Sequence, residues 1–199
     1  NSEHNKRVPT GIYDKNLVCS SCEELFDETD NYAKCFFVDE EYVGEEVSLD
    51  GEQLGISVRN YDYILLKRFF LSLLWRASAS EKEEFQLVNI GKHEKTVGNY
   101  ILSGETDGLD EYSVVLSRFS DHKLAKIFLN PHQEYWETVK CARFYLAGYM
   151  AIVKIDEQPM PQVFAAQVLS PKPPLFIIWR EFENSEEHQL MRKIAKGKL

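Results

Sequence analysis

Apolar positions recur at helical spacing in three stretches of the first half of the chain. Between Glu23 and Phe37 they return every three or four residues, and five acids stand in the first two turns, where the helix dipole favours negative charge. Tyr61 to Ala77 is apolar nearly all round, which is typical of a helix buried on most sides. Glu83 to Leu102 has a weaker helical pattern because Gly91 and Gly98 interrupt it. We expect the second of these helices at the centre of the core.

The pattern changes to that of strands in the second half. Short runs rich in Val, Ile, Phe and Tyr alternate with proline-containing turns. The expected strands are Ser113–Phe119, Leu124–Leu129, Arg143–Ile155, Val163–Leu169 and Leu175–Trp179. They should form a mostly antiparallel sheet.

Two further segments have their own signals. Residues 39–58 are acidic and contain three glycines, so we expect a loop with a short hairpin around Asp50-Gly51. Glu186 to Ala195 is expected to be a closing helix with Ser185 as its N-cap, the alternative being that its basic end is a solvated tail.

Cys19 and Cys22 form a C-x-x-C pair directly before the first helix. The two-residue gap lets two thiolates bind one metal ion, and the helix N-terminus favours their negative charge, so the pair is half of a structural zinc site. Structural zinc takes four ligands, and the sequence has no second such pair. Cys35 would lie about 20 Å away along the same helix, and we expect it and Cys141 to be small buried hydrophobes. Two incidental thiols or a redox pair are the alternatives for Cys19 and Cys22.

These patterns predict an α+β fold. Residues 1–58 would form a zinc-knuckle-like arm with its helix and acidic loop. Residues 59–199 would form the α+β core domain, with buried central helices, a C-terminal, mostly antiparallel sheet and the closing helix. The first residue is asparagine and not methionine, so we also expect the chain to be a fragment of a longer product.

The net charge limits which partners the chain can bind, and the cysteine content indicates the cellular compartment. The 199 residues include 23 basic and 32 acidic side chains, a formal net charge of −9. This balance argues against broad binding to a phosphate backbone, and it leaves only a local basic surface built from Lys67, Arg68, Arg76 or the segment Arg192–Lys198. The longest apolar region, Tyr63–Trp75, contains two of these cations, so no membrane span is expected. Four cysteines are too few for a disulfide scaffold, which favours a reducing cytoplasm.

The sequence contains no motif for a known catalytic chemistry. The five histidines are scattered without metal-ligand spacing, and there is no nucleophile elbow, phosphate-binding loop or dinucleotide fingerprint. The segment Asn130–Trp136 combines a turn, a histidine and two aromatic residues. We interpret it as a loop between strands whose aromatics pack on the sheet edge, with a partner surface as the alternative.

The segment from Asn5 to Glu23, followed by Phe26 and Tyr32-Ala33, resembles bacterial proteins of the HNH-endonuclease-like, treble-clef class. In that class a phrase of the form N-K-R…G…L-x-C-x-x-C-E precedes a helix, and an α-plus-β region completes the chain. The resemblance implies that Cys19 and Cys22 are the second ligand pair of a zinc site. The first pair and the catalytic histidine of the class lie before this segment, so no catalytic residue is carried over to this chain.

Two functions remain open at this point. By the resemblance, the chain is the C-terminal part of an HNH-like zinc-finger protein that binds or cleaves nucleic acid, and it would act as a metal-dependent endonuclease only together with a front half. The alternative is a noncatalytic module that binds a protein partner or a second copy of itself. The net negative charge supports that alternative, as do Tyr135 and Trp136, aromatic residues of the kind that suit contact surfaces.

Metal analysis by mass spectrometry tests the zinc prediction. We expect about one zinc ion per purified chain and its loss in the Cys19→Ser variant, because structural zinc is bound through such thiolates. Wild-type protein that purifies with an intact mass and no zinc would contradict it.

Overall fold

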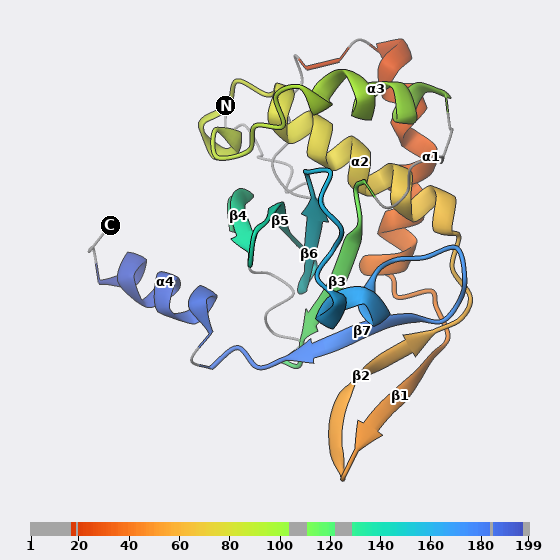
Figure 1. The fold of residues 1–199 in the computed structure, drawn as a ribbon, viewed down its shortest axis with the longest axis vertical. Helices are drawn as coiled ribbons and strands as arrows, with labels where there is room; N and C mark the ends of the chain where they lie inside the picture. The colour runs from red at the N-terminus through yellow and green to blue at the C-terminus, as the bar shows by residue number, and fades with distance from the viewer. Residues whose placement is uncertain (1–16, 19, 104–110, 122–128, 184, 197–199) are drawn as a thin grey trace, which may run out of the picture.

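The fold is α+β, as predicted, and is built on one seven-stranded sheet of order β1-β2-β7-β3-β6-β5-β4. The computed structural model describes residues 17–18, 20–103, 111–121, 129–183 and 185–196 (Figure 1). The strands are β1 Gly44–Leu49, β2 Glu52–Val58, β3 Val114–Phe119, β4 His132–Trp136, β5 Val139–Leu146, β6 Tyr149–Lys154 and β7 Leu175–Arg180. Neighbouring strands are antiparallel except β3 and β7, which run parallel.

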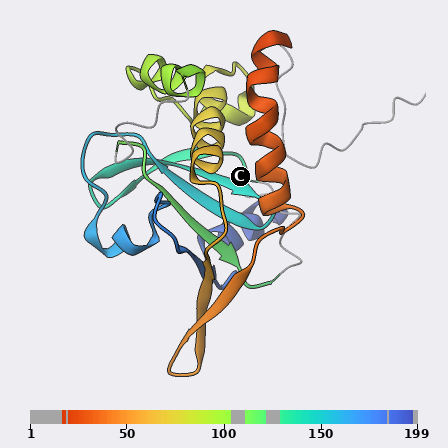
Figure 2. The same cartoon turned by 90° about the vertical axis from the view of Figure 1, so that its right-hand side faces the viewer.

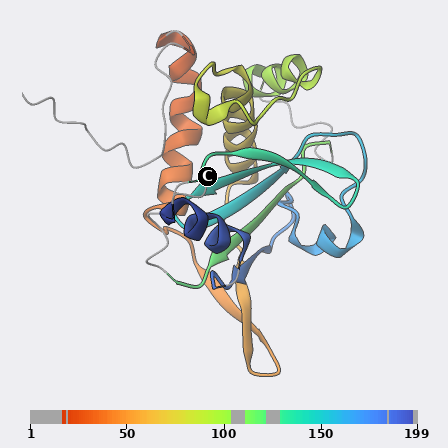
Figure 3. The same cartoon turned by 90° about the vertical axis from the view of Figure 1, so that its left-hand side faces the viewer.

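Helices cover both faces of the sheet (Figures 2 and 3). They are α1 Ser20–Phe37, α2 Tyr63–Ala79, α3 His93–Ser103, α4 Glu186–Ala195 and the 3-10 helices η1 Glu83–Phe85 and η3 Gln162–Gln167. The larger core lies between the sheet and α1, α2 and α3, where Phe37, Phe70 and Tyr149 pack edge to face. A smaller core lies on the opposite face, where Trp136 stacks against Phe164 of η3 with ring centroids 4.2 Å apart.

The predicted helices largely match the structure. α2 is confirmed, with Asp62 as its N-cap accepting a hydrogen bond from the backbone N–H of Leu65 at 2.9 Å. The closing helix is confirmed as α4, and the Ser185 hydroxyl accepts from the N–H of His188 at 3.1 Å. The third helix is shorter than predicted, because Gly91 adopts a positive φ of 50° and only the part after it is α-helical.

The strand predictions were less accurate. The run Arg143–Ile155 is two strands, since Ala147 and Gly148 both have positive φ and reverse the chain between β5 and β6. Residues 162–167 form η3 instead of a strand, and the predicted loop at 130–136 contains strand β4 at the sheet edge. The predicted strand Leu124–Leu129 falls almost wholly outside the described residues.

The acidic segment after α1 forms a hairpin that projects from the body of the molecule (Figures 1 and 2). Its turn is at Asp50 and Gly51, where the sequence places it, and both residues have the positive φ that a tight hairpin turn requires. β2 continues into the sheet by pairing with β7. The predicted boundary between two domains at residue 58 stays a prediction. Two contacts join the segments on either side of it: β2 pairs with β7, and α1 packs against α2.

Two glycine substitutions test this packing, and we expect them to change the stability of the fold in opposite directions. A Cβ at Gly55 would lie 2.2 Å from the carbonyl oxygen of Ile177, so Gly55→Ala should separate β2 from β7 and cost about 2 kcal/mol of stability. A Cβ at Gly98 meets nothing closer than Trp75 Nε1 at 3.6 Å, so Gly98→Ala should stabilise α3 by about 0.5 kcal/mol. Urea unfolding midpoints measure both; equal midpoints for the two variants would contradict the β2–β7 contact.

Candidate functional site

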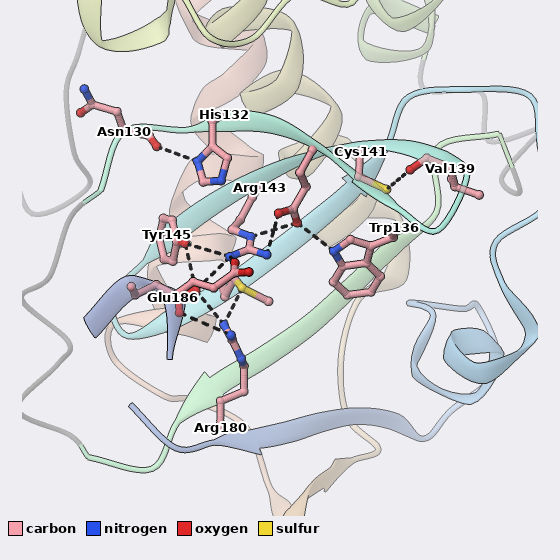
Figure 4. Close-up of polar contacts among 12 residues, drawn as sticks. Asn130, His132, Trp136, Val139, Cys141, Arg143, Tyr145, Arg180 and Glu186 are labelled. Carbon is pink, nitrogen blue, oxygen red and sulfur yellow. Dashed lines mark hydrogen bonds and ion pairs between the residues drawn. The ribbon is translucent and has the colours of Figure 1, made fainter. Parts of the chain in front are cut away.

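Five polar side chains from four elements meet on the face of the sheet under α4 (Figure 4). They are Glu134 of β4, Arg143 and Tyr145 of β5, Arg180 of β7 and Glu187 of α4, and we call them the Glu187 cluster. Arg143 and Tyr145 are two positions apart on β5, so both side chains leave the same face of the sheet.

Glu187 is the centre of this cluster, and its side chain is 1% exposed. Its Oε1 accepts hydrogen bonds from Arg143 Nη1 at 3.1 Å, from Arg180 Nη1 at 3.0 Å and from the Tyr145 hydroxyl at 3.0 Å. A buried carboxylate is tolerated only with partners of this kind, because burial of an unpaired charge costs several kcal/mol. Glu187 therefore holds α4 against β5 and β7.

Arg143 links Glu187 to the edge of the sheet. Its Nε donates to Glu134 Oε1 at 2.9 Å and its Nη2 lies 2.6 Å from Glu134 Oε2, a bidentate pair. Trp136 Nε1 also donates to Glu134 Oε1, at 2.8 Å. Two guanidinium groups and two carboxylates thus neutralise one another, and each carboxylate is shared between donors.

The cluster has the electrostatics of a structural element. Burial by itself raises the pKa of Glu187, but hydrogen bonds from its own backbone N–H, Arg180 and Tyr145, together with the charge of Arg180, bring that pKa below its usual value. Burial opposes ionisation of Arg143, yet Tyr145 and Glu134 raise its pKa. Burial also raises the pKa of Tyr145. None of these three shifts brings a pKa toward neutrality, as a general acid or base at neutral pH requires.

The structure also shows where the proposed basic surface residues lie, and three of them are engaged inside the fold. Lys67 is buried and donates to the carbonyl of Tyr112. Arg68 donates to the carbonyl of Ile101 at 2.8 Å, and Arg76 forms a bidentate pair with Asp30 at 2.8 and 2.9 Å. Lys67 is therefore removed from any basic surface, and Arg68 and Arg76, which are half-buried, are already hydrogen-bonded within the chain.

The cysteine pair falls only in part within the described residues. α1 begins at Ser20, so Cys22 stands in its first turn, while Cys19 and the side chain of Cys22 lie outside what the structure describes. The zinc half-site stays a prediction. Cys141 is fully buried on the sheet face opposite α1, as expected, and burial raises the pKa of its thiol to about 12.

Cys35 is half-buried and not fully buried as expected, and it lies near two carboxylates. Its thiol and the carboxylates of Asp39 and Glu41 lie within 4.8 Å of one another, and among the described residues no other group of three side chains of this kind is as close. Burial and the Glu41 carboxylate raise the pKa of Cys35, so it is a thiol at neutral pH. Asp39 is also paired with Lys34 at 2.7 Å. Glu41 is thus the hydrogen-bond partner of the Cys35 thiol, while Asp39 is the partner of Lys34.

The described histidines make separate structural contacts. His93 Nδ1 lies 3.0 Å from the Tyr112 hydroxyl, His132 Nδ1 lies 3.3 Å from the carbonyl of Asn130, and the ring of His188 packs on Phe182.

No helix in the described part of the chain combines the length and apolar character needed to cross a bilayer.

Comparison with known proteins gives no relative: no family model matches the chain, and neither a curated protein nor a solved structure is significantly similar to it.

The Glu187 cluster itself was not predicted. The signal for it was Arg143, a cation between the apolar residues Ala142 and Phe144, because a charge at an inward strand position needs a buried partner. Its partner Glu187 comes 44 residues later, after β6, η3 and β7, and this spacing carries no information on proximity.

Replacement of Glu187 tests the role of the cluster. Glu187→Gln should cost about 3 kcal/mol, because it leaves the buried guanidinium of Arg143 and the half-buried guanidinium of Arg180 short of counter-charge. Glu186→Gln is the matched control: that side chain is 83% exposed and lies 3.4 Å from Arg143, so it should change stability by less than about 0.5 kcal/mol.

The pH dependence has a defined sign. The folded-state pKa of Glu187 is below its unfolded value of about 4.3, so the carboxylate stabilises the protein fully above that pH. The contribution is lost as pH falls from there through the folded-state pKa. Urea unfolding between about pH 3 and pH 7 should show this loss in wild type and not in Glu187→Gln. If the free energy of unfolding depended on pH in the same way for both proteins, the stabilising role of the Glu187 carboxylate would be refuted.

Proposed function

We propose that the chain is a noncatalytic protein-binding module and that its contact surface is the hairpin arm, residues 43–58. The observation that supports this most is the projection of β1 and β2 beyond the body of the molecule (Figure 1). Apolar side chains along the arm are also exposed. Val43 is 72% exposed and Leu49 is 62% exposed, and Leu54 is also open to solvent. A partner that covered these three side chains would remove their apolar area from water, which favours binding.

The backbone of β1 supports the same proposal. β1 is the outer strand of the sheet, and no backbone hydrogen bond joins it to any described segment besides β2. An open strand edge offers N–H and C=O groups to a further strand, and proteins normally cover or shorten such edges. Strand addition at an open edge is an established mode of peptide recognition.

The base of the arm is held rigidly. The Tyr42 and Tyr149 hydroxyls lie 2.7 Å apart, and the guanidinium of Arg118 lies over the rings of Tyr149 and Trp179 at 4.9 and 5.5 Å. Arg118 also forms an ion pair with Glu40, directly before the arm. A rigid base means that less conformational entropy is lost when a partner binds.

The contrast with the Glu187 cluster favours binding over catalysis. The buried charges there are neutralised by one another, and the arm has no buried ionisable group of its own. The outward surface therefore carries the function in this proposal, and the cluster keeps α4 in place.

Selection from a random-peptide display library tests the role of the arm. Peptides enriched on the wild-type chain should bind Leu49→Asp at least about tenfold more weakly, because a charge at the tip opposes an apolar contact. Leu87→Asp is the control, since Leu87 is equally exposed but lies outside the arm. Peptides that bind both variants equally would place recognition elsewhere and contradict the proposal.

A second candidate is the zinc-containing, nucleic-acid-binding protein of the HNH-like class. The start of α1 directly at the cysteine pair favours it, as do the exposed cations Arg192, Lys193 and Lys196 at the end of α4. Duplex DNA should then be retarded by the chain at low salt and released as salt rises. Replacing Arg192 and Lys193 by serine should abolish the retardation, whereas replacing the exposed Lys95 and Lys172 should not; unaltered DNA mobility with wild type would rule the candidate out.

A further inference from the structure

The hairpin arm is both acidic and exposed to solvent, and its charge indicates the chemistry of its partner. Between Asp39 and Glu52 the chain has seven acids and no base. Glu45, Glu46, Asp50 and Glu52 belong to the arm itself, and all four are exposed. We infer that the partner of β1 is a basic, extended peptide segment that pairs with it as an eighth strand; this rests on the proposed binding role of the arm.

Most of this charge is not neutralised within the fold. The carboxylate of Glu45 lies 3.8 Å from Arg59 Nε, but both side chains are about two-thirds exposed, so the pair is weak. Glu46 accepts a hydrogen bond from Gln53 at 2.9 Å, and this neutral partner leaves its charge in place. Cations supplied from outside would therefore find carboxylates along β1 that are not committed to strong internal ion pairs.

The positions of these acids match a strand that carries cations on both faces. Glu45 and Glu46 are adjacent on β1, so their side chains point to opposite sides of the sheet. A strand added beside β1 would bring its own side chains within about 5 Å of theirs. Lysine or arginine at those positions would form cross-strand pairs on both faces, while apolar residues could cover Val43 and Leu49.

The same charges disfavour a second copy of this chain as the occupant. Two β1 strands placed edge to edge would bring glutamates of one copy near those of the other, and like charges on neighbouring strands are destabilising. The net charge of −9 adds a long-range repulsion between copies at low salt. The acidic edge of β1 thus disfavours pairing with the β1 of a second copy and favours pairing with a basic strand.

Fluorescence anisotropy with short labelled peptides tests the inference directly. The probe is the hexapeptide Val-Val-Lys-Lys-Val-Val, whose adjacent lysines point to opposite faces of an added strand. Two companion peptides separate charge from strand pairing. One has glutamate in place of lysine, and the other keeps the lysines but carries N-methyl groups on alternate backbone nitrogens, which removes the hydrogen bonds of one strand edge. The protein variants are Glu45→Gln with Glu46→Gln on the arm, and Glu24→Gln with Asp27→Asn on α1 as a control of equal charge change.

We expect the lysine peptide to bind wild type and the α1 control alike. Its Kd should rise about fivefold for the arm variant, as expected for the loss of two exposed charge pairs. The N-methylated peptide should bind at least about tenfold more weakly than its parent, because half of the pairing groups on the bound strand are lost.

Three results would overturn the inference. They are equal affinity for the arm variant and wild type, equal affinity for the N-methylated peptide, and self-association of the chain that the lysine peptide does not reverse. If the glutamate peptide binds better than the lysine peptide and loses that binding in Leu49→Asp, the binding role of the arm stands and only the choice of a basic partner fails. If no peptide depends on Leu49, the proposed function fails as well.

Discussion

The insertion of β7 between β2 and β3 is the constraint on which the rest of the structure depends. β7 pairs antiparallel with β2 and parallel with β3, so this C-terminal strand joins the hairpin to the central sheet. Gly55 permits the close contact with Ile177, which is buried together with Leu175. At its far end β7 carries Arg180 to Glu187. One strand therefore anchors both the arm and the helix α4.

The two groups of charged residues have opposite roles because their surroundings differ. In the Glu187 cluster, burial makes each charge depend on an opposite partner, so the group stabilises a single arrangement of α4 and is unavailable for other chemistry. On the arm, exposure leaves the carboxylates hydrated and free to meet cations in solution. An acidic protein can therefore keep several of its arginines inside while it presents an anionic edge.

Local signals in the sequence were sufficient for the elements that have strong periodicity or caps. The helix over α2, the Ser185 cap of α4 and the turn at Asp50-Gly51 were all predicted, because each depends on residues close in sequence. The turn at Ala147 was missed because a non-glycine residue with positive φ has no reliable signal. The Glu187 cluster and the pairing of β2 with β7 could not be predicted, since both depend on contacts between residues far apart along the chain.

The most direct test of the account is amide hydrogen exchange, followed by mass spectrometry, on the chain alone and with the lysine–valine peptide bound. In the free chain the amides on the open edge of β1 should exchange faster than those of β7, which are paired on both sides. Bound peptide should slow exchange in residues 44–49 and leave α4 unchanged. Slowing confined to α4, or β1 amides that are already as protected as those of β7 in the free chain, would contradict the central claim that β1 is an open strand edge used for binding.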